Sequence, residues 1–201
     1  PLVPHAVGSV WFSWSKTAWL YAMGIPALLV GVPALSAASA ATSLVLAFLT
    51  VCCGHSVGLH RGVIHRAFQM PTALRNVLLL LFCQTGLGGP LSWIRVHHAR
   101  DHWQNQLASP PYFAYGHGLL RDYVWNLHFA FTPCSELEWQ GRYGIAREVD
   151  EDPFLRWLEH TWRQQVVCAW LLVALLAGPG LACAVVCGRV AATIVGHWLI
   201  G

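Results

Sequence analysis

Histidine is the residue type whose placement in this chain suggests chemistry. The first of two groups lies in GHSVGLHRGVIHRAF, residues 54–68, where three histidines stand at intervals of five: His55, His60 and His65. The second group lies in SWIRVHHARDHWQNQ, residues 92–106, and holds three more: His97, His98 and His102. Neutral imidazole is a common nitrogen ligand of iron, zinc and copper. The two groups together therefore predict a metal centre.

The spacing within the first group limits which rings can share a metal. Five residues of an ideal α-helix advance by about 500°, so the rings of His60 and His65 would lie roughly 140° apart. The two rings meet at one site only if the helix ends or loosens between them. Gly62 offers that opportunity, because glycine tolerates backbone conformations that other residues avoid.

The second group offers two pairs of neighbours on a helix surface. His98 and His102 are four residues apart, and so are His97 and Asp101, which places each pair on one face of a helix. We expect the metal ligands among five histidines: His60, His65, His97, His98 and His102. We expect Asp101 and His55 either to bind the metal or to orient the residues that bind it.

The composition indicates an integral membrane protein. Of the 201 residues, 56% are hydrophobic and only 10% are charged, whereas soluble domains carry about 25% charged residues. The formal net charge is +3 and the lysines and arginines form no run, which argues against binding to nucleic acid.

A helix needs about 20 apolar residues to cross the hydrocarbon core of a bilayer. The sequence predicts four spans, of which the third is slightly short: Thr17–Leu35, Ala37–Val57, Trp162–Ala177 and Leu181–Ile200. Turns of small residues and proline join them into two helical hairpins, so residues 58–160 lie on one side of the membrane. Ten of the twelve lysines and arginines fall between residues 61 and 163, which predicts that this side is cytoplasmic.

The apolar segment Val77–Cys83, VLLLLFC, is too short to span and is followed closely by glycines and a proline. It suits a helix that lies at the interface or dips into it and returns. Both histidine groups then face the same compartment. The predicted fold is all-α, with four transmembrane helices in two hairpins and a cytosolic helical cap, in a single membrane domain over residues 1–201.

The motifs resemble those of the membrane fatty acid desaturases, which hold two irons with three histidine boxes. The resemblance runs from about residue 50 onward, and GHSVGLHRGVIHRAF, GGPLSWIRVH and TIVGHWLIG look similar to a bacterial branch of acyl-CoA desaturases. The second box departs from the family's H-x-x-H-H, since Arg100 and Asp101 stand at its second and third histidines if His97 is the first. Which second-box residues bind metal therefore stays open. The third box is expected beyond Gly201, so we expect a C-terminally truncated fragment that is inactive alone.

The resemblance implies an O2-dependent di-iron desaturase that introduces a double bond into a long acyl chain, with two Fe2+ ions as cofactors and O2 as co-substrate. The implied partners are a long-chain acyl-CoA or acyl lipid, membrane lipid, and a ferredoxin or small haem cytochrome with its reductase. The arginines of the cap are candidates for binding an anionic headgroup: Arg95, Arg121 and Arg142.

Three other functions fit parts of the same pattern. A membrane di-iron hydroxylase would share the scaffold and differ in its product. A b-type haem electron carrier would use single histidines from different helices as axial ligands. A non-catalytic remnant would keep the fold without holding two metals.

Overall fold

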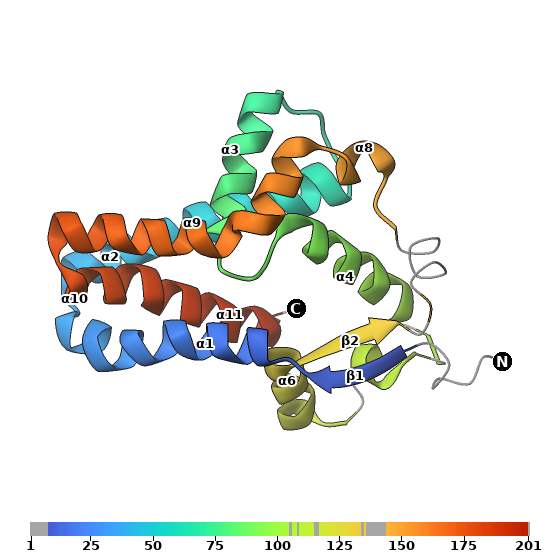
Figure 1. Cartoon of the computed structure of the whole chain (residues 1–201), viewed down its shortest axis with the longest axis horizontal. Coiled ribbons are helices and arrows are strands. Elements are labelled where there is room, and N and C mark those ends of the chain that lie inside the picture. The colour runs from blue at the N-terminus through green and yellow to red at the C-terminus, as the bar shows by residue number, and fades with distance from the viewer. Residues whose placement is uncertain are drawn as a thin grey trace.

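The computed structural model describes residues 8–104, 106–107, 109–114, 117–133, 135 and 144–200, without the side chains of residues 198–200. The described chain is mostly helical (Figure 1). Its membrane-like part begins with α1 (Trp14–Pro26), η2 (Ala27–Gly31), η3 (Val32–Ala34), α2 (Ala37–Ala47) and η4 (Phe48–Ile64). The middle of the chain forms α3 (Thr72–Cys83), α4 (Pro90–Trp103), α5 (Pro111–Ala114), α6 (Leu119–His128) and α8 (Arg147–Asp150). The last part forms α9 (Pro153–Ala177), α10 (Pro179–Ala182), η5 (Cys183–Gly188) and α11 (Arg189–Ile200).

Three helices of the described chain are long and apolar enough to cross a membrane: Trp14–Ala34, Ala37–Ile64 and Pro179–His197. Each overlaps a predicted span, and together they indicate a membrane protein. The second is longer than expected, since it continues seven residues beyond Val57 and carries the first histidine group with it.

The expected third span, Trp162–Ala177, is the second half of the 25-residue helix α9. Its first half carries charged side chains, among them Arg156 and Glu159, and α9 becomes continuously apolar only after Arg163. Gly178, at φ 88°, then turns the chain into α10. The crossing of α9, and with it the four-span arrangement, stays a prediction.

The apolar helices pack along one another and the histidine-bearing elements gather at one end of them. Helices α1, α2 and α9 all contact the η5 segment, and in Figure 1 the turn at α10 lies at the opposite end from α4 and the two strands. The structure therefore has an elongated helical part and a cap on one end of it.

The all-α prediction is wrong in one respect, because two strands pair in the cap. Strand β1 (Gly8–Phe12) is antiparallel to β2 (Phe129–Pro133), with Gly8 opposite Pro133 and Phe12 opposite Phe129. Lys16 Nζ reinforces the junction by donating to the carbonyl oxygens of Asn126 at 2.7 Å and Phe129 at 2.8 Å. The partner strands lie about 120 residues apart in the chain, so no local pattern indicates their pairing.

Helix α3 is the short apolar segment that was expected not to cross. It has twelve residues and lies antiparallel against η4, with Leu78 beside Gly58 and Phe82 beside Gly54. The close approach depends on the missing side chains of these two glycines, as in other membrane helices that pack through small residues.

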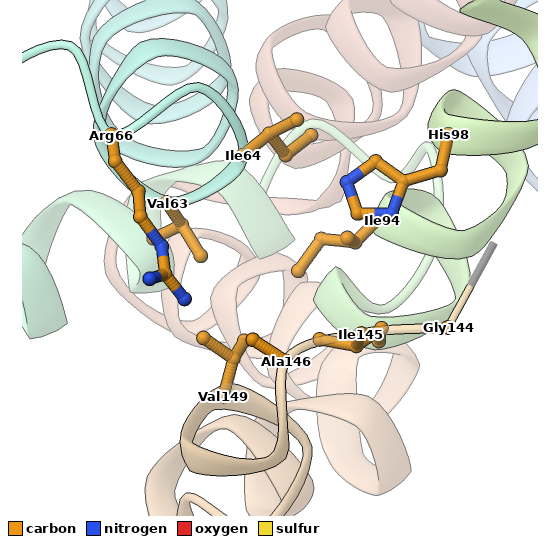
Figure 2. A pocket seen from close by; sticks show the side chains of 9 residues that line it. All are labelled: Val63, Ile64, Arg66, Ile94, His98, Gly144, Ile145, Ala146 and Val149. Atoms are coloured by element: carbon orange, nitrogen blue, oxygen red, sulfur yellow. The ribbon is translucent and has the colours of Figure 1, made fainter. Parts of the chain in front are cut away.

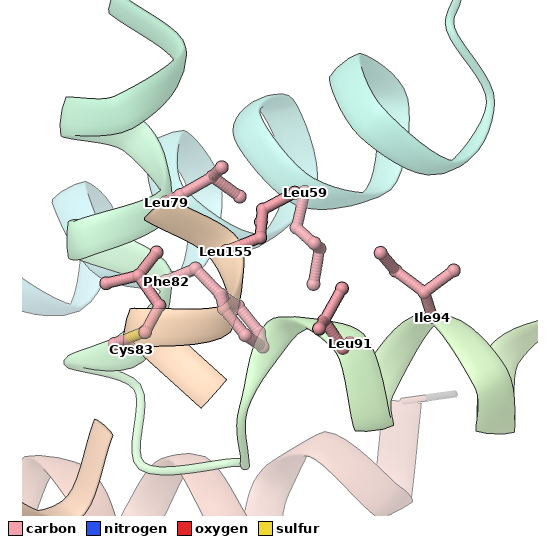
Figure 3. Packing of buried hydrophobic residues seen from close by; sticks show 8 residues of the cluster. Leu59, Leu79, Phe82, Cys83, Leu91, Ile94 and Leu155 are labelled. Carbon is pink, nitrogen blue, oxygen red and sulfur yellow. The ribbon is translucent and has the colours of Figure 1, made fainter. Parts of the chain in front are cut away.

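The core under the cap joins four helices at the point where η4 leaves the apolar part. Leu59 of η4 is fully buried among side chains of the other three helices (Figure 3). These are Leu79, Phe82 and Cys83 of α3, Leu91 and Ile94 of α4, and Leu155 and Leu158 of α9. The core therefore fixes α4, which bears the second histidine group, relative to η4, which bears the first.

Candidate metal centre

Helix η4 places the first histidine group on one face. In this segment the backbone has π-helical hydrogen bonding, in which residue i bonds to residue i+5. At its end, the N–H of His65 donates to the carbonyl oxygen of His60 at 3.0 Å. Residues five apart thus lie one above the other, and the 140° separation of an α-helix does not arise. The expected loosening occurs along the whole segment, while Gly62 packs against the end of Met70 and does not break the helix.

Three imidazoles meet at the end of η4. The Nε2 atoms of His60 and His65 lie 3.3 Å apart, and His97 of α4 brings a third ring, 4.8 Å from His60 and 5.3 Å from His65 between centroids. One nitrogen from each ring lies within 4.8 Å of the other two. We call His60, His65 and His97 the histidine trio.

The trio fits a first-row transition metal. Two nitrogens bound to one ion at about 2.0–2.1 Å lie about 3.0–3.4 Å apart, depending on the coordination angle, and the 3.3 Å between the Nε2 atoms of His60 and His65 falls in that range. Imidazole donors suit iron, zinc and copper and are unusual for magnesium or calcium. His65 is exposed, so the site stays open to solvent on one side.

Asp101 lies beside the ring of His97. Its Oδ2 lies 3.1 Å from Nδ1 of His97, although Nδ1 lacks the alignment of a hydrogen bond. This contact leaves Nε2 as the nitrogen available to a metal. Burial lowers the pKa of His97, an effect that the Asp101 carboxylate opposes, so the ring is neutral at pH 7 and can bind a cation.

Replacing Asp101 by asparagine tests this positioning role. We expect metal affinity to fall about 10- to 100-fold, as is typical when a carboxylate behind a ligating histidine is removed. Isothermal titration of the purified protein with Co2+ measures the change. Asp122→Asn is the matched control, because Asp122 faces His117 at 3.0 Å and not the trio. An unchanged affinity in Asp101→Asn would show that the carboxylate does not orient His97.

Glu159 of α9, which the sequence interpretation left without a role, positions α4. Its Oε2 accepts from the backbone N–H groups of Leu91 at 2.8 Å and Ser92 at 3.1 Å, and its Oε1 accepts from the hydroxyl of Ser92. A carboxylate at a helix N-terminus satisfies free N–H groups and complements the helix dipole. Glu159 therefore fixes the start of the helix that carries His97.

We expect Glu159→Ala to destabilise the protein by about 1–2 kcal/mol, as the loss of a helix cap does. Glu148→Ala is the control, since Glu148 forms an exposed ion pair with Arg66 and exposed ion pairs contribute little to stability. Thermal unfolding of both variants in detergent measures the difference. Equal stabilities would show that the cap contributes nothing.

Two predicted ligands lie away from the trio. The ring of His98 points into a cavity of about 440 Å³, with Arg66 on the opposite wall and Ile64 between them (Figure 2). His102 is exposed, and its Nε2 lies 3.1 Å from the side-chain nitrogen of Gln106. The geometry thus unites one member of the second histidine group with the first group and leaves the other two outside.

His197, in the TIVGHWLIG motif, was not expected to belong to the site. Its ring lies 5.1 Å from that of His55 and 5.0 Å from that of Trp93, between centroids. His55 itself lies 5.3 Å from Trp93 and 6.3 Å from His60. We call His55 and His197 the inner pair, because both lie farther along the apolar helices than the trio.

Two characterised proteins are similar to this chain. An sn-1 stearoyl-lipid 9-desaturase of Anabaena variabilis is 37% identical over 93 residues, which cover 43% of this chain and 33% of the relative. A hex-5-enoyl-[acyl-carrier protein] acetylenase of Moorena producens (strain JHB) is 28% identical over 132 residues, 62% of this chain and 40% of the relative. Both belong to the fatty acid desaturase family.

Over part of its length, this chain is similar to members of the fatty acid desaturase family. The resemblance seen in the histidine motifs is thereby confirmed. The chain spans between one third and two fifths of the length of the two proteins it matches. No protein-family model and no solved structure matches it.

The arginines proposed for headgroup binding take different places in the structure. Arg95 forms an ion pair with Asp150 at 2.7 Å and lines a second cavity, of about 400 Å³. Arg121 lies over the ring of Trp125 at 4.8 Å. Arg142 lies outside the described residues. The described arginines are thus held by the protein's own groups, and their role in substrate binding stays a prediction.

Proposed function

We propose that this protein is an integral membrane, O2-dependent di-iron desaturase of fatty acyl chains, with residues 1–201 belonging to one membrane domain and the histidines on its cytoplasmic face. The observation that carries the proposal is the histidine trio, three imidazoles converging at the end of a helix long enough to cross a bilayer. The relationship to a desaturase and an acetylenase supports it.

His60, His65 and His97 would hold an iron ion, with Asp101 orienting His97. When bound, the two irons of the proposed centre would activate O2 as the oxidant needed to break unactivated C–H bonds, which no side chain can do. The chain's own part is to keep the imidazoles neutral and aligned. Burial favours the neutral form of His97, and the i to i+5 geometry of η4 aligns His60 with His65.

The cavity of about 400 Å³ is the space that would receive the acyl chain. Its walls come from α1, α4, α5, α6, β2, α9 and α11. They are largely aromatic and aliphatic, including Trp19, Trp93, Phe113, Leu127, Phe131 and Trp162. Trp93 separates the cavity from the inner pair, since its ring contacts both His55 and His197. A largely apolar cavity of this size suits a methylene chain.

We propose an acyl-CoA or acyl lipid as the substrate and a ferredoxin, or a small haem cytochrome with its reductase, as the electron donor. The names of the two relatives state a stearoyl lipid and a hexenoyl group on acyl-carrier protein as their substrates. These names support a long-chain or carrier-bound acyl group as the class.

Product analysis tests the proposal. The protein, expressed from its complete gene in membranes of a host without desaturases, receives a saturated acyl chain as the coenzyme A thioester, the acyl-carrier thioester or the membrane lipid. A new carbon–carbon double bond in one of these, dependent on O2 and on an electron donor, is the expected result. A hydroxylated product would show a hydroxylase, and unchanged substrate with less than two irons per chain would show a remnant.

The haem alternative fits the geometry poorly. Axial imidazoles must lie on opposite faces of a porphyrin, whereas His60 and His65 come from one helix with Nε2 atoms 3.3 Å apart. A Soret band in the spectrum of the purified protein would show bound haem and would support this alternative.

A further inference from the structure

The inner pair is a second set of nitrogen donors beside the trio. His55 comes from η4 and His197 from α11, which are different candidate spans. The centroids of the two rings lie 5.1 Å apart, and each ring packs against Trp93. Residues of η4, α4 and α11 therefore meet at one point, which lies farther along the apolar helices than the trio.

His55 is buried, with 9% of its surface exposed. Its Nε2 is completely buried and has no hydrogen-bond partner among the described residues. Buried polar atoms nearly always have a hydrogen-bond partner, so an exception indicates a site for a bound ion or water. A metal ion is the partner that a neutral imidazole nitrogen next to a second imidazole would bind.

The inner pair lies next to the trio on the same face of η4. The rings of His55 and His60 are nearly parallel, at 28°, with centroids 6.3 Å apart. The five-residue repeat therefore continues from the trio to the inner pair, so that His60 has His65 on one side and His55 on the other. The trio and the inner pair are thus neighbouring clusters that together contain five imidazoles.

We propose that His55 and His197 are the chain's ligands for the second iron and that His98 and His102 bind neither ion. This inference rests on the proposed di-iron function and assigns its second metal site. His98 lines the cavity shared with Arg66, and His102 lies beside Gln106 on the exposed end of α4. Two imidazoles leave coordination positions open, as a catalytic metal requires.

Metal content measured by mass spectrometry tests the assignment without recourse to activity. The protein, expressed from its complete gene and purified anaerobically, is loaded with Fe2+ and, in parallel, with Co2+. The inner-pair variant His55→Gln/His197→Gln is compared with the matched control His98→Gln/His102→Gln and with His60→Gln. We expect two ions per chain in the unchanged protein and in the control, and one in the inner-pair variant.

Two results separate this inference from the proposed function. If His60→Gln binds as much metal as the unchanged protein, the proposed function fails. If His60→Gln loses metal while the inner-pair variant keeps two ions, or if the control falls to one, only the assignment of His55 and His197 fails.

The single variant His197→Ala distinguishes the loss of a metal ligand from a general loss of structure. It leaves a space that free imidazole can enter, so added imidazole should restore the second Co2+ ion and its visible absorption bands. A purely structural histidine would give no such recovery of bound metal, and absence of recovery in a variant that melts at the temperature of the unchanged protein would overturn the assignment.

Discussion

Replacing His60 by alanine is expected to remove the metal bound by the trio and to abolish desaturation. His60 lies centrally in the trio, with Nε2 3.3 Å from that of His65 and its ring 4.8 Å from that of His97. Without it, two imidazoles with centroids 5.3 Å apart remain. We expect metal affinity to fall by more than about 100-fold, beyond the effect of removing a residue that only orients a ligand. Metal content and double-bond formation are the two measurements.

His160→Ala is the control for this substitution. His160 is exposed on α9 and belongs to neither histidine cluster, so its loss should leave metal content and product formation unchanged. If His60→Ala retained full metal content, the trio would not be a metal site.

Substituting Gly54 by alanine is expected to destabilise the protein by about 3 kcal/mol, at the upper end of the usual cost of overpacking. A Cβ at Gly54 would lie 2.5 Å from the backbone nitrogen of Phe82 and 2.6 Å from the carbonyl carbon of Leu81. Backbone atoms cannot rotate away, so α3 must move off η4. Because α3 shares its core with α4, metal affinity at the trio should fall together with stability.

Gly24→Ala is the matched control, since Gly24 is also helical and a Cβ there would meet nothing within 4 Å. Alanine favours the helix over glycine by up to about 1 kcal/mol, so this variant should be as stable as the unchanged protein or more so. Thermal unfolding in detergent compares the two. Equal melting temperatures for both variants would show that η4 and α3 do not depend on their close approach.

The proposed centre lies where a membrane oxygenase would need it. The apolar helices and the cavity behind Trp93 adjoin it on one side, and the exposed ring of His65 faces solvent on the other. An acyl chain could therefore approach from the membrane while an electron donor approaches from the aqueous phase.

Much of the architecture follows from local sequence. Long apolar stretches predict the three helices of the described chain that can cross a membrane, because crossing requires a continuous run of apolar residues. The brevity of Val77–Cys83 predicts a helix that does not cross, and α3 has twelve residues. The pairing of β1 with β2 was missed, because its ladder joins residues about 120 positions apart.

The histidine motifs show both the strength and the limit of reading the chain alone. His60 and His65 were expected to share a site, and their rings do meet, but through the π-helical geometry of η4 and not through a break at Gly62. The helical spacing of His98 and His102 made them equal candidates with His97. Only the packing of α4 against η4 decides which side of α4 faces the first histidine group.

The sequence by itself determined the chemistry available to this protein: imidazoles at the end of an apolar helix, in motifs related to those of desaturases. Tertiary structure decided which imidazoles meet. His97 joins the trio because Glu159 of a distant helix fixes the start of α4, and His197 approaches His55 because α11 packs near η4 after more than 130 intervening residues. Spacing along one helix is a local property, whereas contact between helices depends on how their apolar faces share a common core.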